Sequence, residues 1–352
     1  MSASRPSSNR RALLRAALAL PLLARASLGH GQAAANASNA AAPAAGMLRL
    51  SGPAAAVSFP LLHMVDKQVL REHGLTLSFT PWRDPDQLRA LAVGQGGDYV
   101  AMPTNVAANL YNRGVPLRLL NVSMWGVLWM VSRRADMRTL ADFRGEEIAL
   151  PFRADMPDIV FSHLAEQQGL DPRKDFRLRY TATPMDALQL LVMRRVDHAL
   201  LAEPMVSMAL RKTRSFPISV VAPELYRSVN LQEEWGRVLG GEARIPQAGV
   251  AALGKTGTEP VLAARFEAAY AASLRWCIAN PEACGHMVAS HFDMLTPEAV
   301  ADSVAVLPRH YATAAQARPE LEAFFRPLLA RQAAMVGGRL PDAAFYGGEP
   351  RP

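Results

Sequence analysis

One sequence pattern occurs twice and limits the folds that this chain can adopt. In each copy an aspartate is followed by an apolar run, a proline and the start of a helix, first at residues 98–105 and again at residues 197–204. A helix opened by a proline also precedes each copy, at residues 84–88 and 183–188. Because proline suits the first turn of a helix, each copy is predicted to be a buried strand that turns into a helix. The repeat therefore predicts two similar lobes.

Strands and helices alternate along most of the chain. Strands are expected at residues 47–50, 75–79, 98–102, 117–122, 125–131, 147–150, 176–180, 198–202, 218–221 and 244–253. Helices are expected at residues 58–73, from 84, at 104–113, 140–145 and 156–168, from 183, and at 258–279, 281–290, 297–304 and 317–336. Such alternation predicts an α/β fold, with a mostly parallel sheet in each lobe and helices on both faces. Phe345 and Tyr346 are expected to dock the C-terminal tail.

The charge of the chain is concentrated at its N-terminus. The chain has 352 residues, half of them hydrophobic, which suffices for about two domains with packed cores. The first 26 residues contain five arginines and no acidic residue, so removing their five charges from the formal net charge of +7 leaves +2. A nucleic-acid partner, which requires a basic stripe, is therefore not supported.

The N-terminus has the pattern of an export signal over residues 1–26. Residues 9–15 resemble a twin-arginine motif, residues 16–23 are apolar, and residues 24–26 fit a cleavage site. An ordinary secretory signal with two chance arginines is the alternative, and both interpretations predict export to the periplasm. The apolar run is shorter than the roughly 20 residues that a membrane span needs. Residues 27–46 have the composition of a disordered tether.

The chain contains two cysteines, Cys277 and Cys284. An exported protein can join such a pair, but seven residues on one continuous helix rise about 10 Å, which is beyond disulfide reach. Asn280-Pro281 between them predicts a helix stop and restart, so a disulfide and two free thiols are both left open. Cys284, His286 and His291 do not match a known metal-ligand spacing, and no metal site is expected there.

Motifs of catalysis and of cofactor binding are not found. The sequence contains no H-E-x-x-H, no G-x-S-x-G and no Walker loop, and Gly94-Gln95-Gly96-Gly97 lacks the dinucleotide-binding spacing. The interpretation is that the protein is not an enzyme and uses no cofactor.

The order of these elements and four short phrases resemble a known family. The phrases are residues 140–149 (LADFRGEEIA), 169–172 (GLDP), 196–204 (VDHALLAEP) and 276–282 (WCIANPE). Together they resemble the periplasmic substrate-binding proteins of ABC transporters of the nitrate, sulfonate and taurine type, over about residues 47–335. The resemblance implies a type II periplasmic binding fold with two crossing strands as hinge. It places lobe I at residues 47–130 and 245–352 and lobe II at residues 131–244.

The resemblance also implies a function. A monomer of this type binds a small molecule in the cleft between its lobes, closes by hinge motion and delivers the ligand to ABC permease subunits in the inner membrane. Two alternatives stay open: an enzyme on the same fold, of the pyrimidine-synthase or menaquinone-pathway kind, and a periplasmic sensor domain. The export signal and the missing cysteine- and histidine-rich motif count against the enzyme.

The candidate ligand-binding residues follow predicted strand ends, because open α/β sheets bind ligands beyond the carboxyl ends of their strands. Eight residues are proposed as ligand contacts: Ser58, Trp82, Met102, Thr104, Asn105, Trp125, Arg153 and Glu203. Thr104 and Asn105 either bind ligand or cap their helix, and Arg153 either grips an anion or is solvated. Asp155 is predicted to be the N-cap of the helix at residues 156–168.

The remaining candidates also have two interpretations. Glu203 either accepts from a ligand N–H or O–H or pairs with an arginine of the chain. The tryptophans either stack on a planar ligand or fill the core between the lobes. A sulfonate, a carboxylate or a planar heteroaromatic molecule is the expected ligand.

Overall fold

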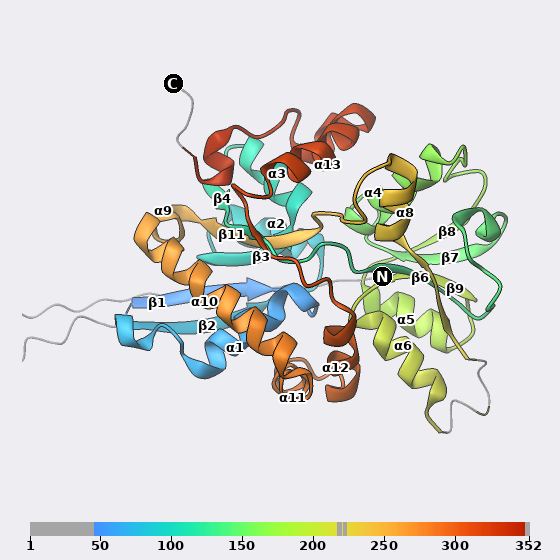
Figure 1. Ribbon diagram of the computed structural model, residues 1–352, viewed down its shortest axis with the longest axis horizontal. Helices are drawn as coiled ribbons and strands as arrows, with labels where there is room; N and C mark the ends of the chain where they lie inside the picture. Colours follow the sequence, from blue (N-terminus) through green and yellow to red (C-terminus); the bar gives the residue numbers. More distant parts are fainter. Residues whose placement is uncertain (1–45, 217–219, 221–223, 349–352) are drawn as a thin grey trace, which may run out of the picture. The chain divides into compact units, whose positions relative to one another are not determined.

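The computed structural model describes residues 46–348, apart from residues 217–219 and 221–223. The expected export signal, the tether up to residue 45 and most of the strand expected at residues 218–221 lie outside the described residues. The described residues form an α/β structure with two five-stranded sheets (Figure 1).

The first sheet combines strands from both ends of the chain. Its strand order is β2 (Leu75–Pro81), β1 (Gly46–Gly52), β3 (Tyr99–Pro103), β11 (Ala248–Leu253) and β4 (Leu117–Leu119). The strands β2, β1 and β3 are parallel, whereas β11 runs antiparallel to both of its neighbours. The late strand β11 was expected from the sequence to return to the first lobe, and this prediction is confirmed.

The second sheet is built from the middle of the chain. Its strand order is β10 (Tyr226–Asn230), β6 (Leu128–Ser132), β9 (His198–Ala202), β7 (Glu147–Pro151) and β8 (Arg177–Thr181). The strands β9, β7 and β8 are parallel, and β6 is antiparallel to β9 and β10. The predicted α/β fold is confirmed: four strands of each sheet run in one direction, and only the strands next to the crossings, β11 and β6, run against them. A small third sheet pairs β5 (Asn121–Val122) with β12 (Ala312–Thr313).

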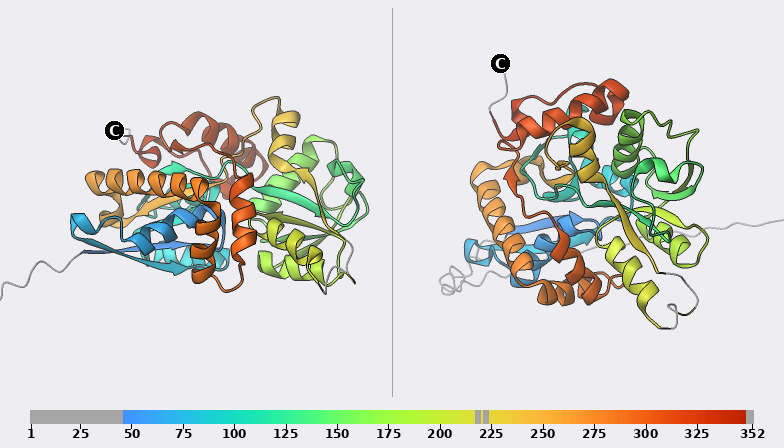
Figure 2. Two further views of the ribbon diagram at one scale, coloured as in Figure 1. Left: turned by 60° about the horizontal axis from the view of Figure 1, so that its bottom comes forward. Right: turned by 45° about the vertical axis from the view of Figure 1, so that its right-hand side comes forward.

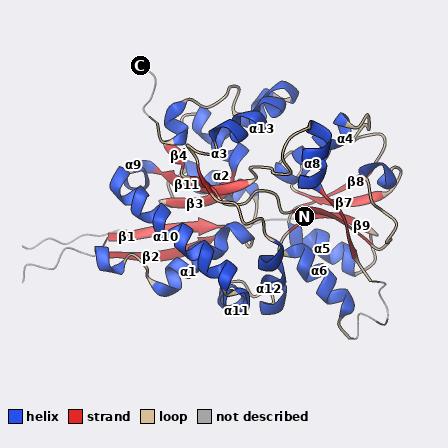
Figure 3. Cartoon of the chain, viewed as in Figure 1, coloured by secondary structure: helices blue, strands red, loops and turns tan. Residues whose placement is uncertain are grey.

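Helices cover both faces of each sheet (Figures 1 and 3). They are α1 (Phe59–Lys67), α2 (Pro85–Val93), α3 (Thr104–Asn112), α4 (Met156–Gln167), α5 (Pro184–Val192), α6 (Met205–Arg214), α8 (Leu231–Leu239), α9 (Gly254–Thr258), α10 (Pro260–Ala279), α11 (Pro281–His291), α12 (Pro297–Val306) and α13 (Arg318–Arg331). Short 3-10 helices lie at Ala56–Ser58, Arg71–His73, Leu140–Phe143, Ala333–Val336 and Ala343–Tyr346. None of the helices in the described part of the chain has the length and apolar character of a membrane span.

Two hydrophobic cores lie on opposite faces of the sheets. Val100 and Met102 of β3 belong to the core beneath α3 and α13, whereas Tyr99 and Ala101 belong to the core beneath α1 and α10. Successive side chains of a strand point to opposite faces, so this one buried strand serves both cores. Each core also contains residues of the second sheet, so the two sheets share both apolar cores. Figure 2 shows the helices on the faces of both sheets from two further sides.

The chain crosses between the sheets twice, and the two crossing segments pair with each other. Met124 in the first crossing and Ala248 in the second form an antiparallel bridge, with N–H···O distances of 3.0 and 3.2 Å. The expected lobe boundary at residue 130 falls inside β6, which begins at Leu128.

Several element predictions differ from the structure. The helix expected at residues 58–73 ends at Lys67, because Gln68 has a left-handed φ of 47° and its side chain bonds the backbone of Leu77 in β2. The strand expected at residues 117–122 divides into β4 and β5, which belong to different sheets. Helix α8 was not predicted; Asn230 caps its start and Gly240 ends it.

The C-terminal tail is docked as expected. Phe345 and Tyr346 are both buried, and Phe345 contacts the rings of Tyr111 and Phe325.

Among the described glycines, Gly249 of β11 leaves the least room for a side chain. A Cβ atom there would lie 1.8 Å from the carbonyl oxygen of Asn121, a backbone atom that cannot rotate away. We expect Gly249→Ala to lower the free energy of unfolding by about 2 kcal/mol or more, because the strand and the crossing must separate. Urea unfolding measures the loss. Gly241→Ala is the control, since nothing lies within 4 Å of its added Cβ. An equal effect of both substitutions would contradict the close approach.

Candidate ligand-binding cleft

A cavity of about 450 Å³ lies between the ends of the two sheets. Its lining comes from the segments that follow parallel strands in both sheets, together with both crossing segments and the end of α11. The two repeat copies end here, with Met102 and Pro103 on one side and Ala202 and Glu203 on the other. This is the edge at which open α/β sheets bind ligands.

The lining is predominantly apolar. Trp82, Phe152 and Phe292 contribute aromatic rings. Six methionines from both sheets also line it: Met102, Met124, Met156, Met185, Met205 and Met294. Thioether side chains are flexible and polarisable, and they make favourable contacts with aromatic rings.

Glu203 lies in the lining, but its carboxylate is bonded within the chain. The residue is 1% exposed. One oxygen accepts from Arg227 at 2.6 Å, and the other accepts from the backbone N–H and the hydroxyl of Ser207 at 3.1 and 2.8 Å. Of the two interpretations drawn from the sequence, the structure contains the pairing with an arginine.

Asp155 is a second buried carboxylate of the lining. It caps α4 by accepting from the N–H of Met156 at 3.0 Å, as the sequence predicted, and it pairs with Arg89 of α2 at 2.7 Å. Burial raises the pKa of the Asp155 carboxyl above its ordinary value, and the charge of Arg89 opposes that rise. The ion pair joins a helix of the first sheet to a helix of the second.

Hydrogen bonds hold the side chains of Trp82 and Gln247 in place in the wall of the cavity. The indole N–H of Trp82 donates to the carbonyl oxygen of Ala101 at 3.0 Å, which holds the ring against the end of β3. Gln247 accepts from the N–H of Val127 at 3.1 Å through its side-chain oxygen, and its backbone carbonyl accepts from the N–H of Thr104 at 3.1 Å. The side-chain NH₂ of Gln247 makes no hydrogen bond with the described residues.

Three of the eight candidate residues, Trp82, Met102 and Glu203, line this cavity. Ser58 and Trp125 do not line it. Ser58 is fully buried beside Gly52, and Trp125 is fully buried, with its indole N–H donating to the carbonyl oxygen of Val122. The hydroxyl of Thr104 donates to the carbonyl of Pro246 at 2.5 Å.

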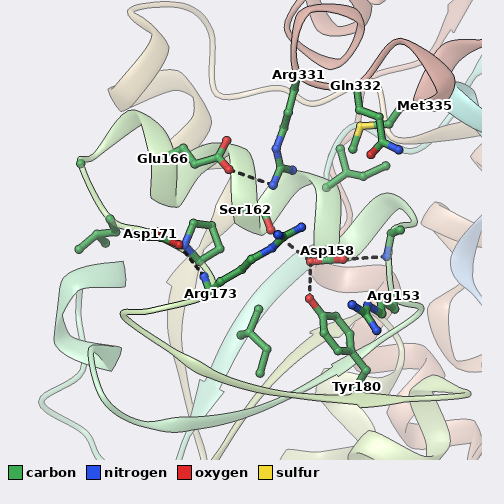
Figure 4. Close-up of a pocket in the computed structure, with 16 residues that line it drawn as sticks. Arg153, Asp158, Ser162, Glu166, Asp171, Arg173, Tyr180, Arg331, Gln332 and Met335 are labelled. Carbon is green, nitrogen blue, oxygen red and sulfur yellow. Dashed lines mark hydrogen bonds and ion pairs between the residues drawn. The ribbon is translucent and has the colours of Figure 1, made fainter. Parts of the chain in front are cut away.

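The other two candidates line neighbouring cavities. Asn105 lines a cavity of about 550 Å³ beside α3. Arg153 lines an outer cavity of about 760 Å³ on the second sheet (Figure 4). Its guanidinium lies 5.3 Å from the ring centre of Tyr180.

The backbone conformation on both sides of Arg153 explains why its side chain lies outside the cleft. Phe152 and Ala154 both have left-handed φ angles, 62° and 59°, and the N–H of Ala154 donates to the buried carboxylate of Asp158 at 2.7 Å. Asp158 also accepts from Ser162 and Tyr180, and Arg331 bridges to Glu166 across the same cavity (Figure 4). Phe152 is thereby left in the lining of the cleft while Arg153 lies outside it.

Sequence reasoning did not propose most of the apolar lining. Met124, Met156, Met185 and Met205 all lie at or after predicted strand ends, so their position was a usable signal. Phe292 and Met294 had no such signal, because they follow α11 and reach the cavity only through the packing of the C-terminal helices.

Comparison with solved structures identifies the fold. No family model and no curated protein matches the sequence. An ABC transporter from Parabacteroides distasonis is similar in structure, with a TM-score of 0.66 and 23% identity over 85% of this chain and 98% of that one. The periplasmic aliphatic sulphonate binding protein SsuA from Escherichia coli gives a TM-score of 0.62 and 16% identity over 84% and 97%.

A third similar structure is the periplasmic nitrate-binding protein NrtA from Synechocystis PCC 6803, with a TM-score of 0.63 and 14% identity over 84% and 83% of the two chains. The chain therefore has the type II periplasmic binding fold of ABC-transporter binding proteins. At these identities the structural similarity shows the fold alone and does not identify the ligand.

The Glu203–Arg227 pair is expected to matter for stability. Arg227→Ala leaves a buried carboxylate without its cation, and we expect a loss of about 3 kcal/mol in the free energy of unfolding. Arg179→Ala is the control, because its ion pair with Glu147 is exposed and such pairs contribute about 0–1 kcal/mol. Adding Glu203→Gln to Arg227→Ala should recover part of the loss, since no buried charge then remains. Equal losses for both arginine substitutions would contradict this account.

Proposed function

We propose that this protein is the solute-binding component of an ABC importer and that it binds a small organic molecule in the cleft between its lobes. The observation that carries the proposal is the cavity at the ends of both strand–proline repeats, lined from both sheets. The export pattern of residues 1–26 supports action in the periplasm, where a permease of the inner membrane receives the ligand.

Hinge closure is the proposed mechanism. The two paired crossing segments are the covalent connections between lobe I (residues 47–130 and 245–352) and lobe II (residues 131–244), and they act as the hinge. Ion pairs away from the hinge join the lobes: Arg89 with Asp155, and Arg211 of α6 with Asp302 of α12 at 2.5 and 2.8 Å. Bringing the lobes together encloses the ligand and presents one closed form to the permease.

A sensor role and an enzymatic role on the same fold are the rival functions. His291 lines the cleft, but its Nε2 lies 2.7 Å from a carboxylate oxygen of Asp66 in α1, which favours a structural contact over proton transfer to a ligand. Permease and ATPase genes beside this gene would distinguish transport from sensing.

Binding in the cleft is testable by thermal shift. We expect a compound from a panel of sulfonates, aromatic acids, nitrate and neutral heteroaromatics to raise the melting temperature, since a ligand at 100 times its dissociation constant adds about 2.7 kcal/mol. Ala54→Trp, which fills the cavity from the loop after β1, should abolish the shift. Ala315→Trp on the exposed surface is the control and should keep it. A shift that survives Ala54→Trp would place the ligand elsewhere.

Closure is testable by small-angle X-ray scattering. We expect the radius of gyration to fall when the ligand from the panel is added at saturation, because the lobes move together. Asp302→Ala removes an interlobe ion pair outside the cleft, so it should weaken binding by no more than about fivefold without touching the ligand. Asp136→Ala, which breaks an exposed pair within lobe II, should leave the affinity unchanged. An unchanged radius of gyration would argue against a hinge.

A further inference from the structure

We propose that the ligand of this cleft is uncharged and predominantly apolar, with an aromatic ring and a hydrogen-bond acceptor. The inference rests on the proposed function and narrows it. It departs from an anionic ligand such as the sulphonate named for the Escherichia coli protein.

The charged side chains of the lining are neutralised within the chain or lie at its rim. Glu203 is bonded to Arg227, Asp155 to Arg89, and His291 to Asp66. The other two charged residues of the lining, Arg83 and Asp293, have opposite signs, and both are exposed. The interior of the cavity therefore offers no unpaired cation to an anionic ligand.

At four helix starts near the cavity, an acidic side chain already accepts from a backbone N–H. Five α-helices, α2 to α6, begin at the cavity, and so does the 3-10 helix at Ala56–Ser58, which has no acidic residue in its first turn. Four of the α-helices carry a carboxylate that already accepts from a backbone N–H of the first turn or of the cap: Asp84 in α2, Asp155 in α4, Asp186 in α5 and Glu203 in α6. A backbone N–H that donates to a carboxylate of the chain is not free to donate to an anionic ligand.

Helix α3 is the exception among the five α-helices, because it has no carboxylate in its first turn. Its first N–H, that of Thr104, donates to the carbonyl oxygen of Gln247, and the hydroxyl of Thr104 donates to Pro246. The hydroxyl of Thr104 is thus turned to the second crossing segment rather than to the cavity.

The apolar lining fits an aromatic ring. The six methionines come from both lobes, and Trp82, Phe152 and Phe292 stand among them. Thioether sulfur makes favourable contacts with aromatic rings, and ring–ring contacts add to the burial of apolar surface. Trp82 is fixed by its hydrogen bond to Ala101, so its ring is held in place before a ligand arrives.

Gln247 supplies the polar anchor. Its oxygen is held by the N–H of Val127, which leaves its NH₂ group as a donor on the wall of the cavity. Gln247 is 8% exposed, so an acceptor on the ligand would satisfy a donor that is otherwise almost buried. A carbonyl or a ring nitrogen of a neutral molecule meets this requirement.

Two fluorescent probes with the same ring system test the charge directly. N-phenyl-1-naphthylamine is uncharged, and 1-anilinonaphthalene-8-sulfonate carries a sulfonate on that scaffold. With the purified full chain we expect the uncharged probe to bind at least tenfold more tightly, by fluorescence titration, and Ala54→Trp but not Ala315→Trp to remove its binding. Equal or tighter binding of the sulfonate in the cleft would overturn the inference and leave the proposed function standing.

Failure of the uncharged probe to bind in the cleft also overturns the inference. If, in addition, no compound of the thermal-shift panel is sensitive to Ala54→Trp, the proposed function fails as well, so the two failures are distinguishable.

A gain of charge provides the converse test. Met294 lies at the exposed side of the lining, so Met294→Arg introduces a guanidinium that the fold can tolerate. We expect this variant to bind the sulfonate probe at least tenfold more tightly than the unmodified protein and the uncharged probe with little change. Met294→Leu is the size-matched control. No gain for the sulfonate would show that scarcity of positive charge is not what excludes anions, and would count against the inference.

Discussion

The antiparallel pairing of the two crossing segments holds the rest of the structure in register. Gln247 is central to it: its N–H donates to Met124, its carbonyl accepts from Thr104, and its side chain accepts from Val127. These bonds tie the second crossing to the first and to the start of α3. Since Gln247 also lines the cavity, the proposed hinge and the proposed ligand site share a residue, and a ligand bonded to its NH₂ would act on that hinge directly.

The two strand–proline repeats end at the cavity with different polar groups, and these groups have different bonding partners. The first ends in Pro103 and Thr104, whose polar groups are bonded to the second crossing. The second ends in Glu203, whose charge is bonded inward to Arg227 and Ser207. One local pattern therefore positions two strand ends at the cavity, while tertiary partners that lie far away in the sequence decide what each end presents. Neither end leaves an ionised group unpaired in the interior.

The parts of the fold that local sequence determines could be predicted. Alternating elements, prolines in first turns and the returning strand near residue 250 gave two α/β lobes, and Asp155 was correctly predicted as a cap. Features set by distant contacts could not be predicted. Arg153 points outward because of left-handed backbone on both sides of it, and Trp125 is buried by the crossing rather than open to the cleft. The segment 291–294 reaches the cavity only through the packing of α11.

The hydration that a ligand loses on closure relates the apolar lining to the class of ligand that can bind. When two lobes close on a molecule, water leaves the cavity, and a charged ligand in its interior loses its hydration without an unpaired cation there to replace it. An uncharged ring loses little hydration and gains contact with the methionines and Trp82. The proposed preference for a neutral ligand therefore rests on the paired charges of the lining and on the carboxylates that already accept from N–H groups at four helix starts.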